Sequence, residues 1–597
     1  KTKSIIEAYP LPPLPEQLVQ MVSWLRQYYP APLGATTLAV LPGQLTAKHI
    51  EATPGITGPV AINDADLPPL TAEQQAVLDG MSRPDTFILH GDTGTGKTRV
   101  YIEQAARTIK SGRSVIVLTP EISLTSQLAQ NFQQIFGERV VVVHSGLTPK
   151  ARQLAWLTIL RSSQNPETPV IVLGPRSALF APVANLGLIV VDEAHEPAYK
   201  QESAPHYHAV RVASQLAHLH QAALILGSAT PGITDYFIAE QKKKPILRMQ
   251  QSARSSEGSE VTVELVDLKD RDKFSRSQYI SDPLIAAIKN SIGRGEQSLL
   301  YLNRRGTARV ILCNNCGWQA ACPHCDLPLT YHHDVYQLQC HTCGWHNGVP
   351  TSCPDCQNTE IVFKVVGTKA IEEEVARLFP EALAMRFDTD NKTAERFEKH
   401  YEAVRSGEVD ILVGTQLLAK GLDLPKLTTL GVVIADTSLT FPDYSAEERT
   451  YQLLNQVIGR VGRGHSAREK IVVQSYDPQR PVIQAALASD WDTFYQAELA
   501  ERQLFNFPPF CYVLQLACRM ASSKAAEAKT EQFMYTIQQL GLPLSVEGPS
   551  PSFHAKAEGK FEWQLIVKSR RRDALLEVIK ALPKSSWSYD IDPINLL

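Results

Sequence analysis

Short apolar runs alternate with helical segments along two long stretches of the chain. In residues 71–248 the runs are TFILHG, SVIVLTP, VVVVHSG, PVIVLGP, LGLIVVDEAH and AALILGSAT. A second series follows in SLLYLNRRG, VFKVVGT, LAMRFDTD, DILVGTQ, TLGVVIADT and KIVVQSYD. Strands that are buried on both faces read as continuous apolar runs, so we expect two parallel sheets, each covered by helices. The predicted fold class is therefore α/β, with two lobes in tandem.

The two ends of the chain follow other patterns. The segment EQLVQMVSWLRQYYPAPLGATTLAVLP has helical periodicity, followed by a turn and a strand-like run. After about Asp490 we expect strands near VLQLACRM, EWQLIVKSR and WSYDIDP, and helices near AAEAKTEQFMYTIQQLG and RDALLEVIKALP. The predicted organisation is a small N-terminal domain at 1–60, a linker at 61–69, lobe 1 at 70–250, lobe 2 at 251–490 and an α+β C-terminal domain at 491–597.

Length and composition limit the class of protein. A chain of 597 residues is too long for one hydrophobic core. Hydrophobic residues make up 44% and charged residues 20%, which is ordinary for a globular protein. With a net charge of -3, any nucleic-acid surface must be local. The sequence contains no apolar run of about 18 residues and no signal-peptide core near its start, so we expect a cytoplasmic protein without a membrane partner.

The segment GDTGTGKT fits the phosphate-loop pattern, after a predicted strand and before a predicted helix. Its glycines, Gly91, Gly94 and Gly96, let backbone N–H groups converge on phosphate oxygens at a helix N-terminus. We expect Lys97 to reach the terminal phosphates and the Thr98 hydroxyl to bind magnesium. The segment therefore predicts that the chain binds ATP with Mg²⁺.

Two further segments belong to the predicted ATP site. In LTAEQQAV, Gln74 or Gln75 could offer an amide to the adenine edge, although a glutamine-rich helix start is otherwise a solvated face. VVDEAH ends a strand with two carboxylates. We expect Asp192 to hold magnesium through water and Glu193 to orient or deprotonate the attacking water. The alternative for this pair is an acidic helix cap.

The segment QVIGRVGR closes the second lobe, after GSATP in the first. At their spacing, Arg460 and Arg463 can lie on one helix face and reach across an interlobe cleft toward the γ-phosphate. Hydrolysis would then depend on closure of the lobes. A basic stripe on a surface helix is the alternative.

In this order, the phosphate loop, DEAH, SAT and QxxGRxGR resemble the motifs of superfamily 2 helicases. Longer strings resemble the PriA family of bacterial replication-restart helicases, namely LTPEISLT, HSGL, GPRSALFAP, YLNRRGTA, GTQLLAKGLDLP and PDYSAEERTYQLLNQVIGRVGR. The resemblance implies two tandem RecA-like lobes and an ATP-dependent 3′ to 5′ DNA helicase. It also implies that the protein binds stalled or forked DNA independently of sequence and initiates replication restart by assembling the primosome.

The resemblance further implies DNA contacts. YKQESAPHYHA matches the family's aromatic-rich loop, which couples DNA to the ATP site. Rings such as that of Tyr199 could stack on bases while Lys200 meets phosphate, and a plain surface loop is the alternative. Along the strand's phosphates we place Thr119, Arg176, Thr415 and Lys420. The expected partners are forked and single-stranded DNA, single-stranded DNA-binding protein and primosome proteins, with the chain a monomer associated with the nucleoid.

The family likeness extends to the C-terminal region and is incomplete at the N-terminal end. ERQLFNFPPF and VEGPSPSFHAKAEGKFEWQLIV match, with Lys556 and Lys560 where the family commonly has arginine. KSRRR is a DNA or partner patch or a solvated charge run. The N-terminal segment matches only part of the family's DNA-binding domain, so we expect most of the pocket for a 3′ end to be missing. Between AVLPGQL and LTAEQQ there is also too little sequence for the winged-helix domain that the family usually has, so either this branch of the family lacks the domain or its residues are not part of this sequence.

Eight of the ten cysteines form four CxxC pairs in an insert at 311–358. The pairs are Cys313/Cys316, Cys322/Cys325, Cys340/Cys343 and Cys353/Cys356. Eight thiolates make two closed, structural zinc sites. The segment between the inner pairs, DLPLTYHHDVYQLQ, predicts a hairpin that brings these pairs together. We therefore assign the inner four cysteines to one Zn²⁺ and the outer four to the other, as the family resemblance also implies.

Other assignments in the insert remain possible at this point. A histidine ligand could replace a cysteine, from the set His324, His332, His333 and His341. Disulfides are a poorer alternative in a cytoplasmic chain. Trp318 could meet the DNA fork or pack inside the insert.

Two other functions compete with a DNA helicase. An RNA helicase could use the same lobes, because the ATP site does not distinguish the two nucleic acids. An ATP-gated DNA-binding scaffold would need no catalytic groups. The presence of every catalytic candidate argues against the scaffold: Lys97, Asp192, Glu193, Arg460 and Arg463.

Overall fold

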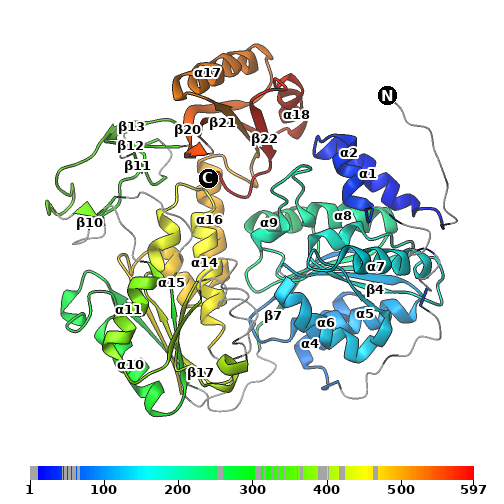
Figure 1. Cartoon of the computed structure of the whole chain (residues 1–597), viewed down its shortest axis with the longest axis horizontal. Helices are drawn as coiled ribbons and strands as arrows, with labels where there is room; N and C mark the ends of the chain where they lie inside the picture. The colour runs from blue at the N-terminus through cyan, green and yellow to red at the C-terminus, as the bar shows by residue number, and fades with distance from the viewer. Residues whose placement is uncertain are drawn as a thin grey trace. The chain divides into compact units, whose positions relative to one another are not determined.

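The computed structural model places most of the chain in two compact units, residues 1–253 and 254–597 (Figure 1). The residues that the structure describes are 11–43, 45, 50, 55–56, 62, 67–120, 122–251, 260–302, 311–313, 318–324, 327–332, 336–341, 343–359, 361–362, 367–387, 400, 402–415, 424–461, 468–557 and 559–596. Within these ranges, no helix combines the length and apolar character needed to cross a membrane.

The first unit contains a parallel sheet with the strand order β3-β4-β2-β5-β6-β1-β7. Its strands are β1 (Thr86–Gly91), β2 (Ser114–Leu118), β3 (Val140–Val142), β4 (Ile171–Gly174), β5 (Leu186–Val191), β6 (Ala223–Ser228) and β7 (Ile246–Met249). The first six strands confirm the six predicted apolar runs. The edge strand β7 was not predicted, because it is only half-buried and lacks a continuous apolar run.

Helices cover both faces of this sheet, as the apolar strands require. They are α4 (Ala72–Gly80), α5 (Lys97–Lys110), α6 (Ile122–Phe136), α7 (Pro149–Ser162), α8 (Ala209–His220) and α9 (Ile233–Gln241). One core joins α4, α5 and α6 to alternate strand residues such as Phe87, Leu89, Val115 and Val117. Helix α8 packs on the opposite face (Figure 1).

Two N-terminal helices belong to the same unit, α1 (Glu16–Tyr28) and α2 (Leu33–Val40). Helix α1 packs against α8 and buries Leu18, Met21 and Leu25. The prediction of a strand after the turn is wrong, since that run forms α2. Thr36 and Val40, four residues apart, are buried on one helical face, and tertiary packing here overrides the strand preference of threonine and valine.

The second unit contains a parallel sheet with the order β15-β16-β9-β17-β18-β8. Its strands are β8 (Glu260–Asp267), β9 (Gln297–Tyr301), β15 (Ala384–Phe387), β16 (Ile411–Gly414), β17 (Leu427–Val432) and β18 (Arg468–Ser475). Around it lie α10 (Asp282–Gly293), α11 (Thr368–Leu378), α14 (Ala446–Ile458), α15 (Pro481–Leu487) and α16 (Trp491–Leu504).

Two strands of this unit differ from the prediction. The run VFKVVGT was assigned to the lobe, but its described start belongs to β14 (Ile361–Val362), which pairs with β10 (Leu312–Cys313) at the base of the insert. Residues 363–366 lie outside the described residues. The sixth lobe strand is instead the edge strand β8, where Val261 and Val263 are exposed and the apolar run is interrupted by polar residues.

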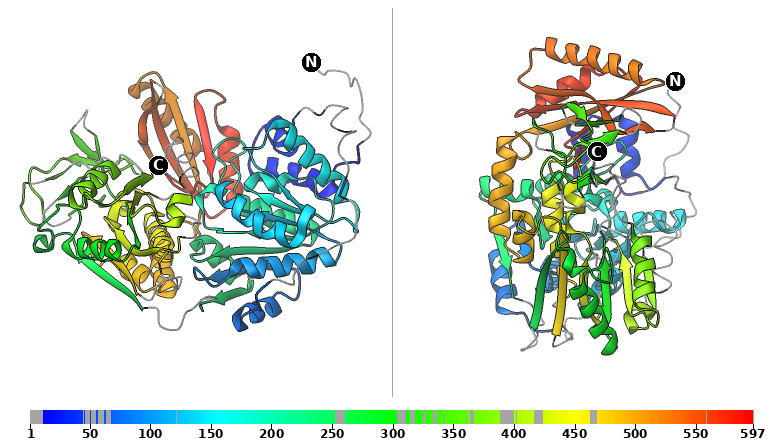
Figure 2. Two further views of the ribbon diagram at one scale, coloured as in Figure 1. Left: turned by 60° about the horizontal axis from the view of Figure 1, so that its bottom comes forward. Right: turned by 90° about the vertical axis from the view of Figure 1, so that its left-hand side faces the viewer.

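Besides the β10–β14 pair, the insert and the C-terminal domain each form an antiparallel sheet of the second unit (Figure 2). The insert sheet consists of β11 (Thr330–His332), β12 (Gln337–Gln339) and β13 (His346–Gly348). The C-terminal sheet has the order β20-β21-β19-β22, with β19 (Tyr512–Met520), β20 (Ser545–Ala557), β21 (Lys560–Ser569) and β22 (Trp587–Ile591). Helices α17 (Ser523–Gln539) and α18 (Arg572–Ala581) pack on that sheet, which confirms the α+β prediction.

Candidate nucleotide and zinc sites

The phosphate loop lies between β1 and α5, and its glycines are required by its geometry. Gly94 and Gly96 have φ values of 86° and 82°, in the left-handed region that favours glycine. A Cβ on Gly91 would lie 2.9 Å from Thr95 Oγ1, closer than ordinary packing allows. The loop therefore brings backbone N–H groups to the N-terminus of α5, where an anion is stabilised.

Lys97 is the first residue of α5 and folds back over the loop. Its Nζ donates a hydrogen bond of 2.7 Å to the carbonyl oxygen of Gly91. A phosphate oxygen could take the place of this carbonyl without moving the helix. Thr98 follows in the same turn and is half-buried. Burial raises the pKa of Asp92 in this loop, while the Lys97 and Arg248 charges oppose that rise.

Gln74 touches the phosphate loop but does not present a free amide. Its Nε2 donates to the Thr95 carbonyl at 3.1 Å, and its Oε1 accepts from Thr71 N–H at 3.0 Å in a capping box of α4. Its side chain is almost fully buried. Gln75 is exposed and bonds Asp79. Gln74 thus fixes the loop to α4, and a contact of either glutamine with adenine stays a prediction.

Asp192, at the end of β5, is held by two tyrosines that the sequence did not single out for this purpose. The hydroxyl of Tyr101, on α5, donates to Asp192 Oδ1 at 3.0 Å. The hydroxyl of Tyr199 donates to the Asp192 carbonyl oxygen at 2.5 Å. Burial, followed by the Glu193 carboxylate, raises the pKa of Asp192, and the charge of Lys97 opposes this. The same burial keeps the pKa of both tyrosines well above 10, so each remains a donor.

A glycine makes room for Tyr101. A Cβ on Gly227, in the segment GSATP, would overlap the Tyr101 hydroxyl. The carbonyl of the same glycine accepts a hydrogen bond of 2.9 Å from Ala194 N–H. Strand β6 thus supports both the residue that orients Asp192 and the turn that follows it.

Glu193 adopts φ 46°, an unusual value for a residue with a side chain. Its Oε2 lies 3.6 Å from His195 Nδ1, which is itself 2.6 Å from Ser228 Oγ on β6. Ser228 Oγ also accepts from Thr230 N–H at 2.9 Å. The DEAH turn and the SAT segment are therefore joined by direct side-chain contacts.

The residues predicted to bind DNA in the first unit are largely buried. Arg176 donates to the carbonyl of Ala198 and, at 2.8 Å, to Gln201 Oε1, so it binds the aromatic-rich loop. Tyr199 is fully buried. It ends a short 3₁₀ turn, Pro197–Tyr199, and its buried ring is not exposed to a base in this conformation, so stacking of Tyr199 on DNA stays a prediction.

Lys200 does not extend into solvent either. It is 4% exposed, and its Nζ lies 5.8 Å from the centre of the Tyr29 ring. A phosphate contact of this residue would require the loop to move.

Thr119 and Thr415 follow β2 and β16, one in each unit. Both are nearly fully buried. Each backbone N–H continues its sheet, Thr119 to Gly174 at 3.0 Å and Thr415 to Phe387 at 3.3 Å. They lie at the carboxyl edge of their sheets, the edge at which open α/β sheets bind ligands. Lys420 lies outside the described residues.

Of the two arginines of QVIGRVGR, the structure describes Arg460, which lies beyond the end of its helix. Helix α14 ends at Ile458, with Gly459 as its cap, and Arg460 lies in the turn that follows. Two glycines in this segment favour the end of a helix. Arg463 lies outside the described residues, so a common surface of the two arginines stays a prediction.

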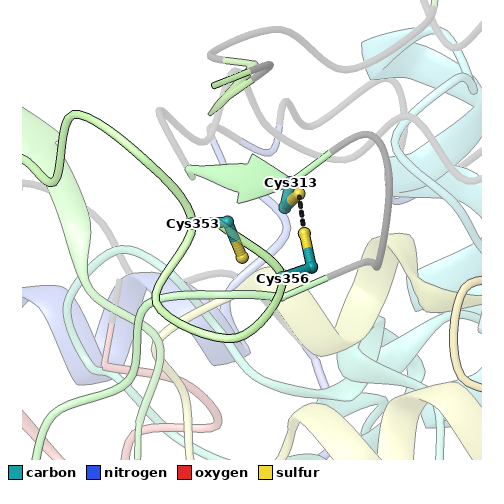
Figure 3. Close-up of side chains that lie close together, drawn as sticks. All are labelled: Cys313, Cys353 and Cys356. Carbon is teal, nitrogen blue, oxygen red and sulfur yellow. Dashed lines mark hydrogen bonds between the residues drawn. The ribbon is translucent and has the colours of Figure 1, made fainter. Parts of the chain in front are cut away.

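The cysteines of the insert gather into two groups, nested as the hairpin predicts. Cys313, Cys353 and Cys356 form the outer group (Figure 3), and Cys322, Cys340 and Cys343 form the inner group. In the outer group Sγ of Cys313 lies 3.6 Å from Sγ of Cys356. In the inner group Sγ of Cys322 lies 3.6 Å from Sγ of Cys343.

These sulfur separations fit a metal ion. Thiolates that bind zinc at about 2.3 Å in a tetrahedron lie about 3.8 Å apart, whereas a disulfide needs about 2.05 Å. The donor set and spacing therefore fit zinc in each group. The fourth cysteines of the prediction, Cys316 and Cys325, lie outside the described residues.

Both groups contain the same tight turn. The residue after the second cysteine has a positive φ, 81° in Gly344 and 59° in Gln357. Its N–H donates to the carbonyl of the first cysteine, at 3.0 Å for Cys340 and 2.9 Å for Cys353. This turn directs the two thiolates of a pair to one point.

The structure describes Trp318 and two of the four histidine candidates of the insert with their side chains. Trp318 is partly buried against the insert core, which answers whether it packs inside the insert. His324 is exposed beside Trp345. The ring of His341 points away from the cysteines, toward Pro551. The side chains of His332 and His333 lie outside what the structure describes.

A third group of potential ligands was not predicted from the sequence. Glu447, Glu498 and Glu501 bring carboxylate oxygens together. Arg502 donates to Glu498 and to Glu448 at 2.7 Å each, so a buried cation already lies beside this cluster.

Comparisons with known proteins agree with this geometry. The DEAD/DEAH box helicase family matches residues 71–236, and the helicase conserved C-terminal domain matches residues 357–465. The replication restart protein PriA of Treponema pallidum is 32% identical over 96% of this chain and 87% of its own length. The chain belongs to the PriA family. The PriA Cys-rich region matches residues 322–347, and the primosomal protein N C-terminal domain matches residues 503–594.

Other relatives differ in length from this PriA-family chain. The Bacillus subtilis replication restart protein PriA is 36% identical over 86% of the chain, but the chain covers only 64% of that protein. Among solved structures, RecG bound to a three-way DNA junction matches 81% of the chain and 52% of its own length at 15% identity, with a TM-score of 0.44.

Proposed function

We propose that this PriA-family chain is an ATP-dependent 3′ to 5′ DNA helicase. It would bind stalled or forked replication DNA independently of sequence and initiate replication restart by assembling the primosome. The observation that carries the proposal is the phosphate loop beside the DEAH carboxylates in the first unit, with Lys97 on the loop and Asp192 oriented by Tyr101. Family membership supports the substrate, and the resemblance to the family supports the direction of movement.

In the proposed reaction the residues of the first unit bind and orient ATP. Lys97 would exchange the Gly91 carbonyl for a phosphate oxygen. Thr98 and Asp192 would hold Mg²⁺, which neutralises charge on the phosphates. Glu193, beside His195, would orient or deprotonate the attacking water. Arg460 and Arg463 would approach the γ-phosphate when the lobes close.

DNA would be sensed through the residues that contact the aromatic-rich loop. Arg176 binds the loop at Ala198 and Gln201, while Tyr199 connects the start of the loop to the backbone of Asp192. A DNA phosphate that attracts Arg176 would therefore disturb contacts that lead to the ATP site. Thr119, Thr415 and Lys420 would contact further phosphates of the strand.

Two structural Zn²⁺ ions would close the insert, one on each set of four cysteines. Cys316 would complete the outer set and Cys325 the inner set. We expect the protein to act as a monomer on the nucleoid in the cytoplasm, with single-stranded DNA-binding protein and primosome proteins as partners.

The test is unwinding of matched substrates. Forked DNA with a single-stranded arm of either polarity, and an RNA duplex of the same sequence, are compared with ATP and with a non-hydrolysable analogue. We expect ATP-dependent unwinding on DNA of one polarity, and Lys97→Ala should abolish it while DNA binding persists. Unwinding of RNA alone would favour an RNA helicase, and DNA binding without any unwinding by the wild-type chain would favour a scaffold.

A further inference from the structure

His341 lies between two cysteines of the inner group, but its ring is directed at the C-terminal domain. It is 2% exposed, and its Nδ1 lies 2.6 Å from the carbonyl oxygen of Pro551 on β20. A carbonyl can only accept, so Nδ1 carries the proton of this hydrogen bond. The ring also meets the Phe553 ring edge-to-face at 5.7 Å between centres.

The backbone of His341 is bound by the same sheet. Its carbonyl oxygen accepts one hydrogen bond from Ser550 Oγ at 2.6 Å and another from Gln564 Nε2 at 2.8 Å. Both donor residues are at most 1% exposed. Gln564 is oriented in turn by Gln515 on β19, whose Nε2 donates to Gln564 Oε1 at 2.8 Å. The sheet thus presents a prepared donor pair to one carbonyl of the cysteine turn.

The turn itself has no room for a larger residue at its end. Gly344 has φ 81°, and a Cβ there would lie 3.1 Å from the Pro549 carbonyl oxygen. The segment 549–551 therefore lies directly on the turn between Cys340 and Gly344. The contact depends on the shape of a turn whose two thiolates are directed to one point.

We propose that this turn, in its described residues 340, 341, 343 and 344, is the docking surface of the insert for the chain's own C-terminal domain. His341 acts as a positioning residue, and a metal ion on the inner cysteines keeps the turn in the shape that β20 and β21 recognise. The inner site would then hold the C-terminal domain in place as well as closing the insert, whereas the outer site would serve the base of the insert. This goes beyond the helicase function proposed above and does not depend on it.

The decisive test is amide hydrogen exchange of the full, zinc-loaded chain without nucleotide or DNA. In His341→Ala we expect exchange in residues 545–553 and 562–567 to rise by about 10-fold or more, because a buried carbonyl loses its donor. His341→Asn can donate from a similar position and should restore much of the protection. His324→Ala is the matched control, since His324 follows Cys322 of the same group by two residues but is exposed, and exchange in this variant should equal that of wild type.

Three further variants approach the contact from its two sides. Ser550→Ala lies on the C-terminal domain, away from the metal, and should raise exchange in residues 340–344 with zinc content unchanged. Cys340→Ser should loosen β20, while Cys353→Ser in the outer group should leave it protected. The proposal is overturned if His341→Ala and Ser550→Ala both exchange like wild type, or if Cys353→Ser loosens β20 as much as Cys340→Ser does.

Discussion

Replacing Tyr101 by phenylalanine removes one hydroxyl and keeps the ring that fills the core. The lost group is the donor to Asp192 Oδ1 at 3.0 Å. A hydrogen bond to a charged group contributes about 1.5–3 kcal/mol. If the whole energy of this hydrogen bond serves to orient the carboxylate for Mg²⁺, its loss should lower ATPase activity by about 10- to 150-fold at limiting Mg²⁺. The ring remains packed, so the free energy of unfolding should change little.

The assay is DNA-stimulated ATP hydrolysis measured across a range of Mg²⁺ concentrations. We expect Tyr101→Phe to raise the Mg²⁺ concentration for half-maximal activity and to lower kcat. Tyr495→Phe is the control, because Tyr495 is equally buried but lies on α16, in the second unit. If Tyr101→Phe stays within about two-fold of wild type in both quantities, Tyr101 fills space only and our account of Asp192 fails.

Three other predictions test separate features. In Gly227→Ala the added methyl group should displace the Tyr101 hydroxyl from Asp192 and lower the free energy of unfolding of the first unit by about 1–3 kcal/mol. ATPase activity should therefore fall below that of Tyr101→Phe, and a higher activity than that of Tyr101→Phe would contradict this. Elemental analysis should find about two zinc ions per chain, and none or one would contradict the two-site assignment. Burial lowers the pKa of His208 to about 3, helped by Arg211 and Lys200. The unfolded chain, with a pKa near 6.5, therefore takes up the proton first as pH falls, and the first unit should lose about 2 kcal/mol by pH 5. Urea unfolding of His208→Asn, which can still cap α8, should lack this loss; an unchanged pH dependence would show that His208 is not responsible.

The sequence predicts the site well where a residue pattern is compatible with few local structures. Glycines ahead of a lysine at a helix start predicted the phosphate loop, and paired cysteines at fixed spacing predicted the nested cysteine groups. Few other structures require these residues at these positions. Strands buried on both faces were found for the same reason. The edge strands β7 and β8 were missed, since half-exposed strands have no continuous apolar run.

Residues with two uses could not be assigned from the sequence. Tyr101 has the helical spacing of a core residue, and only the structure shows that its hydroxyl meets Asp192. Tyr199 is part of an aromatic-rich segment that favours base stacking, yet a 3₁₀ turn buries it. His341 has the position of a ligand and the contacts of a docking residue. In each case the direction of the side chain decides the role, and that direction depends on residues distant in the sequence.

The pairing of β8 with β18 determines when the second sheet can be completed during synthesis. β8 is the first strand of the second sheet, and its partner is the last, beyond the insert and every other strand of that sheet. During synthesis the first unit can complete its sheet early, whereas β8 must wait, with an unpaired edge and exposed valines, until β18 leaves the ribosome. Chains truncated before residue 475 should therefore aggregate, and capture of zinc by the insert should precede closure of the lobe that surrounds it.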